Sequence, residues 1–260
     1  MTRYDLSPDA VSQASPTQAK PTVVACLGSS STAGKGQAFD WISELERRPR
    51  NQRFRFLNLG VGGDLAYNAL QRLPDLFASR PHKALVWVGG NDVLALVSPK
   101  ARHYFRVTKR LPTEPSPEGF RENLLAIVHR LKTETSAIIA LCSLPPIGED
   151  PASSDPLQSE LNRRIEQYST TIRQIAQEQN VACIAIHETL SAQIKASPGR
   201  AFTSFNFLPF YRDAFRVFVE RKSPDEVAQA NGWRFHTDGI HLNSRSGMIV
   251  ADLVQQFIDR

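Results

Sequence analysis

Five short apolar runs alternate with segments of helical spacing, and this alternation constrains the fold of the chain more than any other feature. The runs lie at residues 22–27, 54–59, 84–88, 137–142 and 181–186. Between them, apolar residues recur every three or four positions, as in 120–132 and in the final stretch 247–257. Continuous apolar strands that alternate with helices are typical of a parallel sheet covered by helices on both faces. The sequence therefore predicts an α/β protein with a five-stranded parallel sheet.

The limits of this pattern predict how the chain is organised. Residues 1–21 are rich in Ser, Pro, Gln and Ala and show no periodicity, which predicts a mobile N-terminal segment. Residues 22–260 are expected to form a single domain, because a chain of 260 residues does not require two. Two segments, at about 98–117 and 196–234, break the regular spacing and are interpreted as insertions.

Each insertion has a distinctive composition. The first holds five Lys and Arg residues and no acid among 98–112, which favours a solvated face and leaves open a contact of Arg102 and Arg106 with an anionic substrate. The second contains aromatic residues at helical spacing: Phe207, Tyr211, Phe215 and Phe218. This spacing favours a helix packed on the core over an apolar lid.

Composition limits the classes of function. The apolar runs are far too short to span a bilayer, so no integral membrane association is expected. The formal charge of +5 comes without a basic stripe interleaved with aromatic residues, which argues against nucleic acid as a partner. Cys26, Cys142 and Cys183 lie in apolar runs and are expected to be buried thiols. An odd number of cysteines and an N-terminus without an apolar signal region predict a cytoplasmic protein.

Polar motifs follow the first three strands, and a fourth motif lies near the end of the chain. They read GSSST at 28–32, NLGVGGD at 58–64, GGND at 89–92 and DGIH at 238–241. Ligands of open parallel sheets bind beyond the carboxyl ends of the strands, so these motifs are expected to meet there.

The residue types in these motifs fit acyl transfer. The Ser30 hydroxyl needs a base to become a nucleophile, and His241 can supply it if Asp238 fixes the tautomer of the imidazole. The backbone N–H groups of Ser30 and Gly60 and the side-chain amide of Asn91 can converge on the oxyanion that develops during the reaction. We therefore expect a catalytic triad of Ser30, Asp238 and His241 and an oxyanion hole of Ser30, Gly60 and Asn91. Asp92 is interpreted as structural.

Taken in order, the four motifs resemble those of the SGNH (GDSL-type) hydrolase family over residues 22–257. Ser30, Gly60 and Asn91 match the first three motifs of the family, and Asp238 with His241 matches the last; LPPIG at 144–148 is also similar to the family. The resemblance implies a flavodoxin-like three-layer α/β/α sandwich and an esterase, lipase, thioesterase or carbohydrate deacetylase. One residue departs from the pattern, because Ser29 stands where the family usually has an aspartate.

The predicted function is hydrolysis of a small-molecule ester, as a carboxylic ester and possibly an O-acetyl ester or thioester, through an acyl-enzyme. A small acyl group is favoured over a long chain. A long-chain lipase and a catalytically impaired acyl- or glycan-binding protein, the latter motivated by Ser29, remain alternatives.

Other sites are less well supported by the sequence. His187 and His236 are rival bases, but neither has an acid three residues before it. Residues 28–36 (GSSSTAGKG) lack the spacing of a phosphate-binding loop, and Thr32 replaces the second glycine of a G-x-S-x-G elbow. No cluster has the spacing of zinc ligands, so neither a metal nor a cofactor is expected.

Overall fold

The five apolar runs form the five strands of one parallel sheet. In this computed structural model, which describes residues 20–34, 38–205 and 221–260, the strands lie in the order β2-β1-β3-β4-β5. Their bounds are Thr22–Gly28 (β1), Phe54–Gly60 (β2), Lys83–Trp87 (β3), Ile138–Cys142 (β4) and Ala182–Ile184 (β5). All of the pairings are parallel, and this order is the flavodoxin-like one. The predicted fold class is therefore confirmed.

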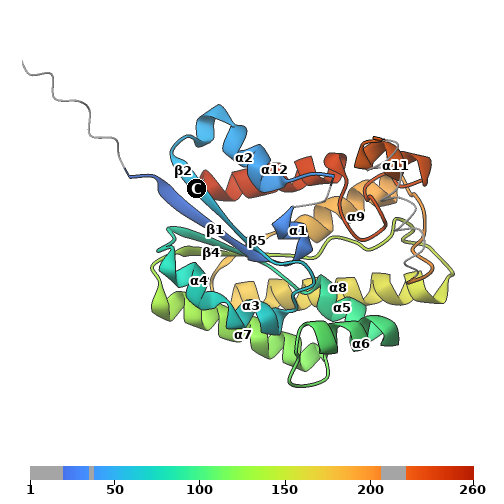
Figure 1. Cartoon of the computed structure of the whole chain (residues 1–260), viewed down its shortest axis with the longest axis horizontal. Helices are drawn as coiled ribbons and strands as arrows, with labels where there is room; N and C mark the ends of the chain where they lie inside the picture. Colours follow the sequence, from blue (N-terminus) through green and yellow to red (C-terminus); the bar gives the residue numbers. More distant parts are fainter. Residues whose placement is uncertain (1–19, 35–37, 206–220) are drawn as a thin grey trace, which may run out of the picture.

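Helices cover both faces of the sheet and complete a three-layer sandwich (Figure 1). One layer contains α2 (Trp41–Arg47), α9 (Ile186–Ala196) and α12 (Ser244–Ile258). The other contains α3 (Ala66–Gln71), α4 (Leu73–Ala78), α5 (Gly90–Val97), α7 (Pro117–Glu134) and α8 (Pro156–Glu178). The remaining described helices are short or lie at the rim: α1 (Ser30–Ala33), η1 (Pro49–Asn51), α6 (Pro99–Thr108) and α11 (Pro224–Ala230).

Burial follows the position of each strand in the sheet. In β1 every residue after Thr22 is buried, because the strand has a neighbour on each side and helices above and below. The edge strand β5 is less covered: Cys183 is exposed, whereas Cys26 and Cys142 are buried. The expectation of three buried thiols is therefore wrong for Cys183.

A proline divides the helical segment that follows β2. The apolar spacing of residues 65–76 is typical of one helix, but the structure has α3 and α4, which meet at Arg72. Pro74 lies at the start of α4, where its missing N–H and fixed φ are tolerated. In the interior of a single helix it would lose a hydrogen bond and clash with the preceding turn.

Each insertion contains a capped helix. In the first, Ser98 accepts a hydrogen bond from the Ala101 N–H and Pro99 begins α6. In the second, Ser223 and Glu226 form a reciprocal capping box at the start of α11. The aromatic residues at helical spacing, 207, 211, 215 and 218, lie outside the described residues. Among the helices that the structure describes, none combines the length and the apolar character needed to cross a membrane.

Candidate active site

The first strand delivers Ser30 to the carboxyl edge of the sheet. Ser30 begins the short helix α1, directly after Gly28 and Ser29. Gly28 and Gly60 lie opposite each other at the ends of β1 and β2. A Cβ on Gly60 would lie 2.2 Å from the Ala33 nitrogen, so only glycine lets α1 lie across the end of β2.

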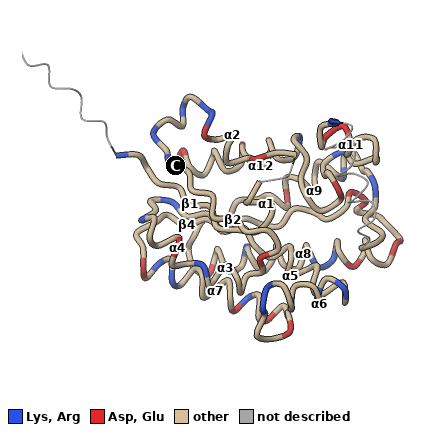
Figure 2. The backbone as a smooth tube through the Cα atoms, in the orientation of Figure 1, with Lys and Arg blue, Asp and Glu red and all other residues tan. Residues whose placement is uncertain are grey.

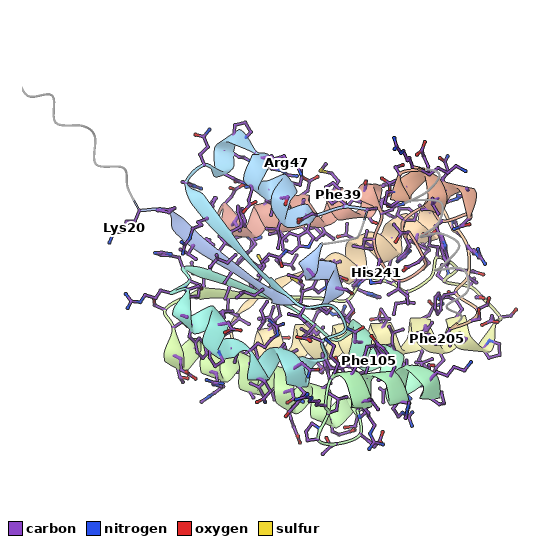
Figure 3. The ribbon with its side chains drawn as sticks, in the orientation of Figure 1. Lys20, Phe39, Arg47, Phe105, Phe205 and His241 are labelled. Carbon is purple, nitrogen blue, oxygen red and sulfur yellow. The ribbon has the colours of Figure 1, made fainter. Side chains whose placement is uncertain are left out.

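The predicted triad is assembled in the structure. The Nε2 atom of His241 lies 3.1 Å from the Ser30 Oγ, and its Nδ1 atom lies 2.7 Å from Asp238 Oδ2. With a proton on Nδ1 donated to the carboxylate, Nε2 can accept the Ser30 hydroxyl proton. The two residues lie 211 positions apart in the sequence, and His241 is labelled at the carboxyl end of the sheet in Figure 3.

A tight turn places the acid and the base on the same side of their loop. Asp238 Oδ1 accepts hydrogen bonds of 2.8 Å from the N–H groups of both Ile240 and His241, which is the geometry of an Asx turn. Gly239 adopts a φ of +90°, a conformation that side chains with a Cβ rarely reach. Because the turn occupies only Oδ1, the second carboxylate oxygen, Oδ2, is directed at the imidazole.

Asp238 and His241 shift each other's pKa. Burial lowers the pKa of His241, but the charge and hydrogen bond of Asp238 outweigh it, and the pKa lies above its ordinary value of 6.5. Burial alone would raise the pKa of Asp238. The charge of His241 and the N–H donors of the turn outweigh burial and hold the pKa well below its ordinary value of 3.8. The carboxylate therefore stays ionised at neutral pH and makes the imidazole a stronger base.

Two of the three predicted oxyanion donors line the cavity at this site. Ser30 and Asn91 both do so, and the Asn91 side chain is oriented by a 2.9 Å hydrogen bond from Nδ2 to the Asp64 carbonyl. Gly60 is placed differently: its N–H donates to Asn58 Oδ1 at 3.0 Å, and it is not among the residues that line the cavity. A role for Gly60 as an oxyanion donor would require its N–H to leave Asn58, and it stays a prediction.

A charged network that the motifs did not indicate supports the loop between β2 and α3. The buried Asp64 carboxylate receives the Arg72 guanidinium at 2.7 Å and the Lys109 ammonium at 2.9 Å. Arg72 also donates to the carbonyls of Leu59 and Gly28, at the ends of two strands. Because the Asp64 carbonyl orients Asn91, this network connects the Asn91 side chain to both strand ends.

Asp92 has the structural role expected for it. Its carboxylate accepts the Ala66 N–H at the start of α3 at 3.2 Å, and burial raises its pKa to about 7. Asp92 therefore fastens α5, which carries Asn91, to α3.

A small apolar cavity opens beside Ser30 and Asn91. Its volume is about 30 Å³, room for about two water-sized groups. The apolar wall is formed by Leu94, Leu144, Ile147, Ile165 and Ile240. These residues come from α5, the loop after β4, α8 and the loop of Asp238, and sequence periodicity gave no signal for their convergence.

The rival histidines are engaged elsewhere. His187 lies with Nε2 2.6 Å from Glu166 and Nδ1 3.1 Å from the Leu144 carbonyl. His236 is fully buried between Glu149 and the Pro146 carbonyl. Neither histidine has Ser30 as a partner in these contacts, whereas His241 does.

The basic insertion makes contacts within the protein. Arg102 donates to the carbonyls of Ala95 and Leu96 at the end of α5, and Arg106 pairs with Glu114. Figure 2 shows Lys and Arg mixed with Asp and Glu on the helices around the sheet. These contacts give no support to the hypothesis that Arg102 and Arg106 bind an anionic substrate. Within residues 20–34, 38–205 and 221–260, no group of His, Cys, Asp and Glu is arranged to hold a metal ion.

Comparisons with solved structures show the same fold. The acetyl xylan esterase AlAXEase is 20% identical with a TM-score of 0.59, over 91% of this chain and 99% of that one. Axe2, an acetylxylan esterase from Geobacillus stearothermophilus, is 16% identical with a TM-score of 0.59, over 91% and 94%. A lipase/acylhydrolase from Enterococcus faecalis is 17% identical with a TM-score of 0.58, over 91% and 95%.

A search of curated proteins found no match. The model of the GDSL-like lipase/acylhydrolase family, in contrast, matches residues 26–245, which include all four motifs. The chain therefore belongs to the GDSL-like lipase/acylhydrolase family and is an ester hydrolase.

Proposed function

We propose that this hydrolase is a serine esterase that removes a small acyl group, of about acetyl size, through an acyl-enzyme on Ser30. The observation that carries the proposal is the continuous chain of contacts from Ser30 Oγ to His241 Nε2 and from His241 Nδ1 to Asp238. This chain forms with Ser29 in place of the aspartate of the family pattern, so the substitution does not disrupt the charge system.

The reaction follows from the positions of these atoms. Ser30 Oγ attacks the carbonyl carbon of the ester while its proton passes to His241 Nε2. The oxyanion of the tetrahedral intermediate accepts hydrogen bonds from the Ser30 N–H and the Asn91 amide. His241 then returns the proton to the departing alkoxide, which leaves as an alcohol. The acyl group remains on Ser30 as an ester. A water molecule, deprotonated by the same imidazole, hydrolyses that ester and regenerates the hydroxyl.

Solved relatives provide support for the same residue types. Catalytic mutants of Axe2 have been made at a serine, an aspartate and a histidine, and the last two lie three residues apart. Asp238 and His241 have this spacing as well. The names of the relatives also include acetylated polysaccharide substrates, in agreement with a small acyl group.

The size of the cavity predicts a preference for short acyl chains. A volume of about 30 Å³ beside Ser30 has room for about two water-sized groups, which supports an acyl group of about acetyl size. The kcat/KM for p-nitrophenyl esters is therefore expected to fall by about tenfold or more from acetate to butyrate, as measured by release of p-nitrophenol. Ile240→Ala removes part of the wall and is expected to narrow this difference. Highest activity on octanoate or longer esters would favour the long-chain lipase instead.

Covalent labelling tests the acyl-enzyme directly. A fluorophosphonate probe is expected to modify the wild-type protein stoichiometrically, and mass spectrometry should locate the adduct on Ser30, because His241 lies within hydrogen-bond distance of that hydroxyl. Ser30→Ala should abolish labelling. Ser31→Ala removes the neighbouring hydroxyl of the same turn and should label like the wild type. An unlabelled wild type would favour a protein that only binds acyl or glycan groups.

A further inference from the structure

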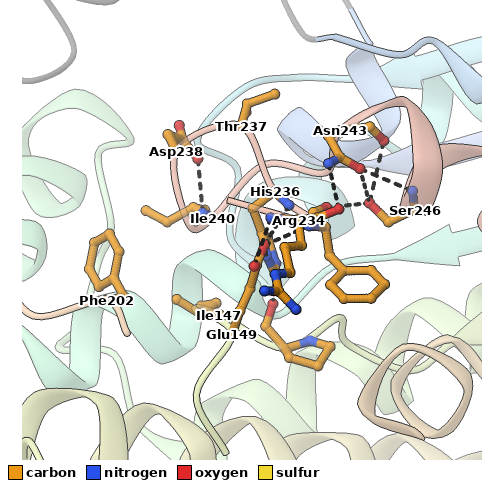
Figure 4. Close-up of polar contacts among 12 residues, drawn as sticks. Ile147, Glu149, Phe202, Arg234, His236, Thr237, Asp238, Ile240, Asn243 and Ser246 are labelled. Carbon is orange, nitrogen blue, oxygen red and sulfur yellow. Dashed lines mark hydrogen bonds and ion pairs between the residues drawn. The ribbon is translucent and has the colours of Figure 1, made fainter. Parts of the chain in front are cut away.

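A buried carboxylate joins the loop after β4 to the loop that carries the catalytic acid and base. Glu149 is fully buried. Its oxygens accept the backbone N–H groups of Arg234, Phe235 and His236 at 2.7–2.8 Å and face the His236 Nδ1 at 3.0 Å. Figure 4 shows these contacts converging on one side chain. Three successive residues of the C-terminal loop are thus held by a single carboxylate.

The partner imidazole makes a second link between the two loops. His236 is also fully buried, and its Nε2 lies 2.9 Å from the Pro146 carbonyl. A carbonyl and a carboxylate can only accept hydrogen bonds, so each ring nitrogen of His236 faces an acceptor. Burial raises the pKa of Glu149, but the hydrogen bond and charge of His236 and the backbone N–H groups outweigh it and lower the pKa below its ordinary value. The two residues therefore form a buried hydrogen-bonded pair.

The pair is continuous with the catalytic residues and with the cavity. His236 precedes Asp238 by two positions, and the Thr237 N–H donates to the His241 carbonyl at 2.8 Å. The Gly148 N–H donates to the Gly239 carbonyl at 2.7 Å, which adds a third link between the loops. Next to these links, Ile147 and Ile240 both line the cavity.

A buried pair of polar or charged side chains is a poor source of net stability. The cost of removing such groups from water cancels most of their attraction, and apolar side chains of similar volume often stabilise a protein equally well. What the pair does provide here is geometry, because each of its contacts joins one of the two loops to the other.

We propose that Glu149 and His236 are positioning residues, which set the distance between His241 and Ser30 and hold Ile147 and Ile240 at the spacing that admits only a small acyl group. This inference rests on the proposed esterase function and adds the element that determines its rate and its acyl preference. Loosening the pair is then expected to slow the chemical step and at the same time to widen the cavity.

The test is Glu149→Gln, assayed with p-nitrophenyl acetate and p-nitrophenyl butyrate. Glutamine keeps the size of the side chain, but its amide nitrogen meets N–H donors where the carboxylate accepted them. We expect kcat for the acetate to fall by about 10- to 100-fold with a smaller change in KM, and the butyrate-to-acetate ratio to rise. His236→Gln, whose amide can still reach the Pro146 carbonyl, should lie between the wild type and Glu149→Gln.

A matched control separates positioning from general destabilisation. Asn51 is buried at the opposite edge of the sheet, where it exchanges hydrogen bonds with Gln255 and donates to the Leu45 carbonyl. Asn51→Ala should lower the melting temperature but leave kcat and the acyl ratio unchanged at 25 °C.

Three outcomes would overturn the proposal. In the first, Glu149→Gln folds and keeps both kcat and the acyl ratio of the wild type. In the second, it changes both only as much as Asn51→Ala does. In the third, both pair variants fail to fold while Asn51→Ala folds, which would mean that the pair supports the whole domain. An inactive, unlabelled wild type is a different result, because it contradicts the proposed function itself.

Discussion

Replacing His241 with alanine is expected to lower kcat for ester hydrolysis by about 10⁶-fold, because single deletions of a triad base have effects of this size. The hydroxyl of Ser30 lies 3.1 Å from the His241 imidazole, and without a base it is a weak nucleophile at neutral pH. KM should change little, since the ring contacts the nucleophile and does not line the cavity. Steady-state hydrolysis of p-nitrophenyl acetate, with highly purified variants, measures both constants.

The matched control for this variant is His129→Ala. His129 is exposed on α7, so its loss removes an imidazole without touching the carboxyl edge of the sheet. This variant should keep the wild-type kcat. If His241→Ala retained more than about a hundredth of the wild-type kcat, another base would have to deprotonate Ser30, and the triad assignment would be wrong.

The fold could be predicted from the sequence because its signals are local. Apolar runs of five or six residues gave the strands, and their bounds differ from the observed ones by one or two residues. Two misses have physical causes that periodicity does not contain. Pro74 divides a segment whose apolar spacing is otherwise that of one helix, because its backbone has no N–H to donate and its ring clashes with the preceding turn. Cys183 lies in an apolar run but on the edge strand, and the order of strands is a property of the tertiary structure.

The candidate site could be predicted where its residues lie in short motifs. Ser30, Asp238 and His241 come together because parallel strands end at one edge and an Asx turn spans three residues. Glu149 gave no such signal. It lies beside Asp150 in a loop, and its partners lie 85 to 87 positions further along the chain. Its function depends on the contact between two loops, which no local pattern records.

Asp238→Asn is expected to lower kcat by about 10⁴-fold, the size of the effect of this change on other serine hydrolases. The Asn Oδ1 can still accept the N–H groups of Ile240 and His241, so the Asx turn should survive. The Asn Nδ2, however, donates to the imidazole Nδ1 and drives the proton to Nε2. The nitrogen that faces Ser30 then carries a proton and cannot accept another.

The same variant predicts a change in the pH dependence of kcat/KM. A general base acts only when it is neutral, so activity is lost as the pH falls through the pKa of His241. In the wild type Asp238 raises that pKa above 6.5, which places the acid limb at a higher pH than an unperturbed histidine would give. In Asp238→Asn the charge is absent and burial alone remains, which lowers the pKa and moves the acid limb to lower pH. Asp225→Asn, at a carboxylate that accepts the Ser244 N–H, should leave the acid limb in place. An acid limb that stays in place in Asp238→Asn would mean that Asp238 does not set the charge of the catalytic imidazole.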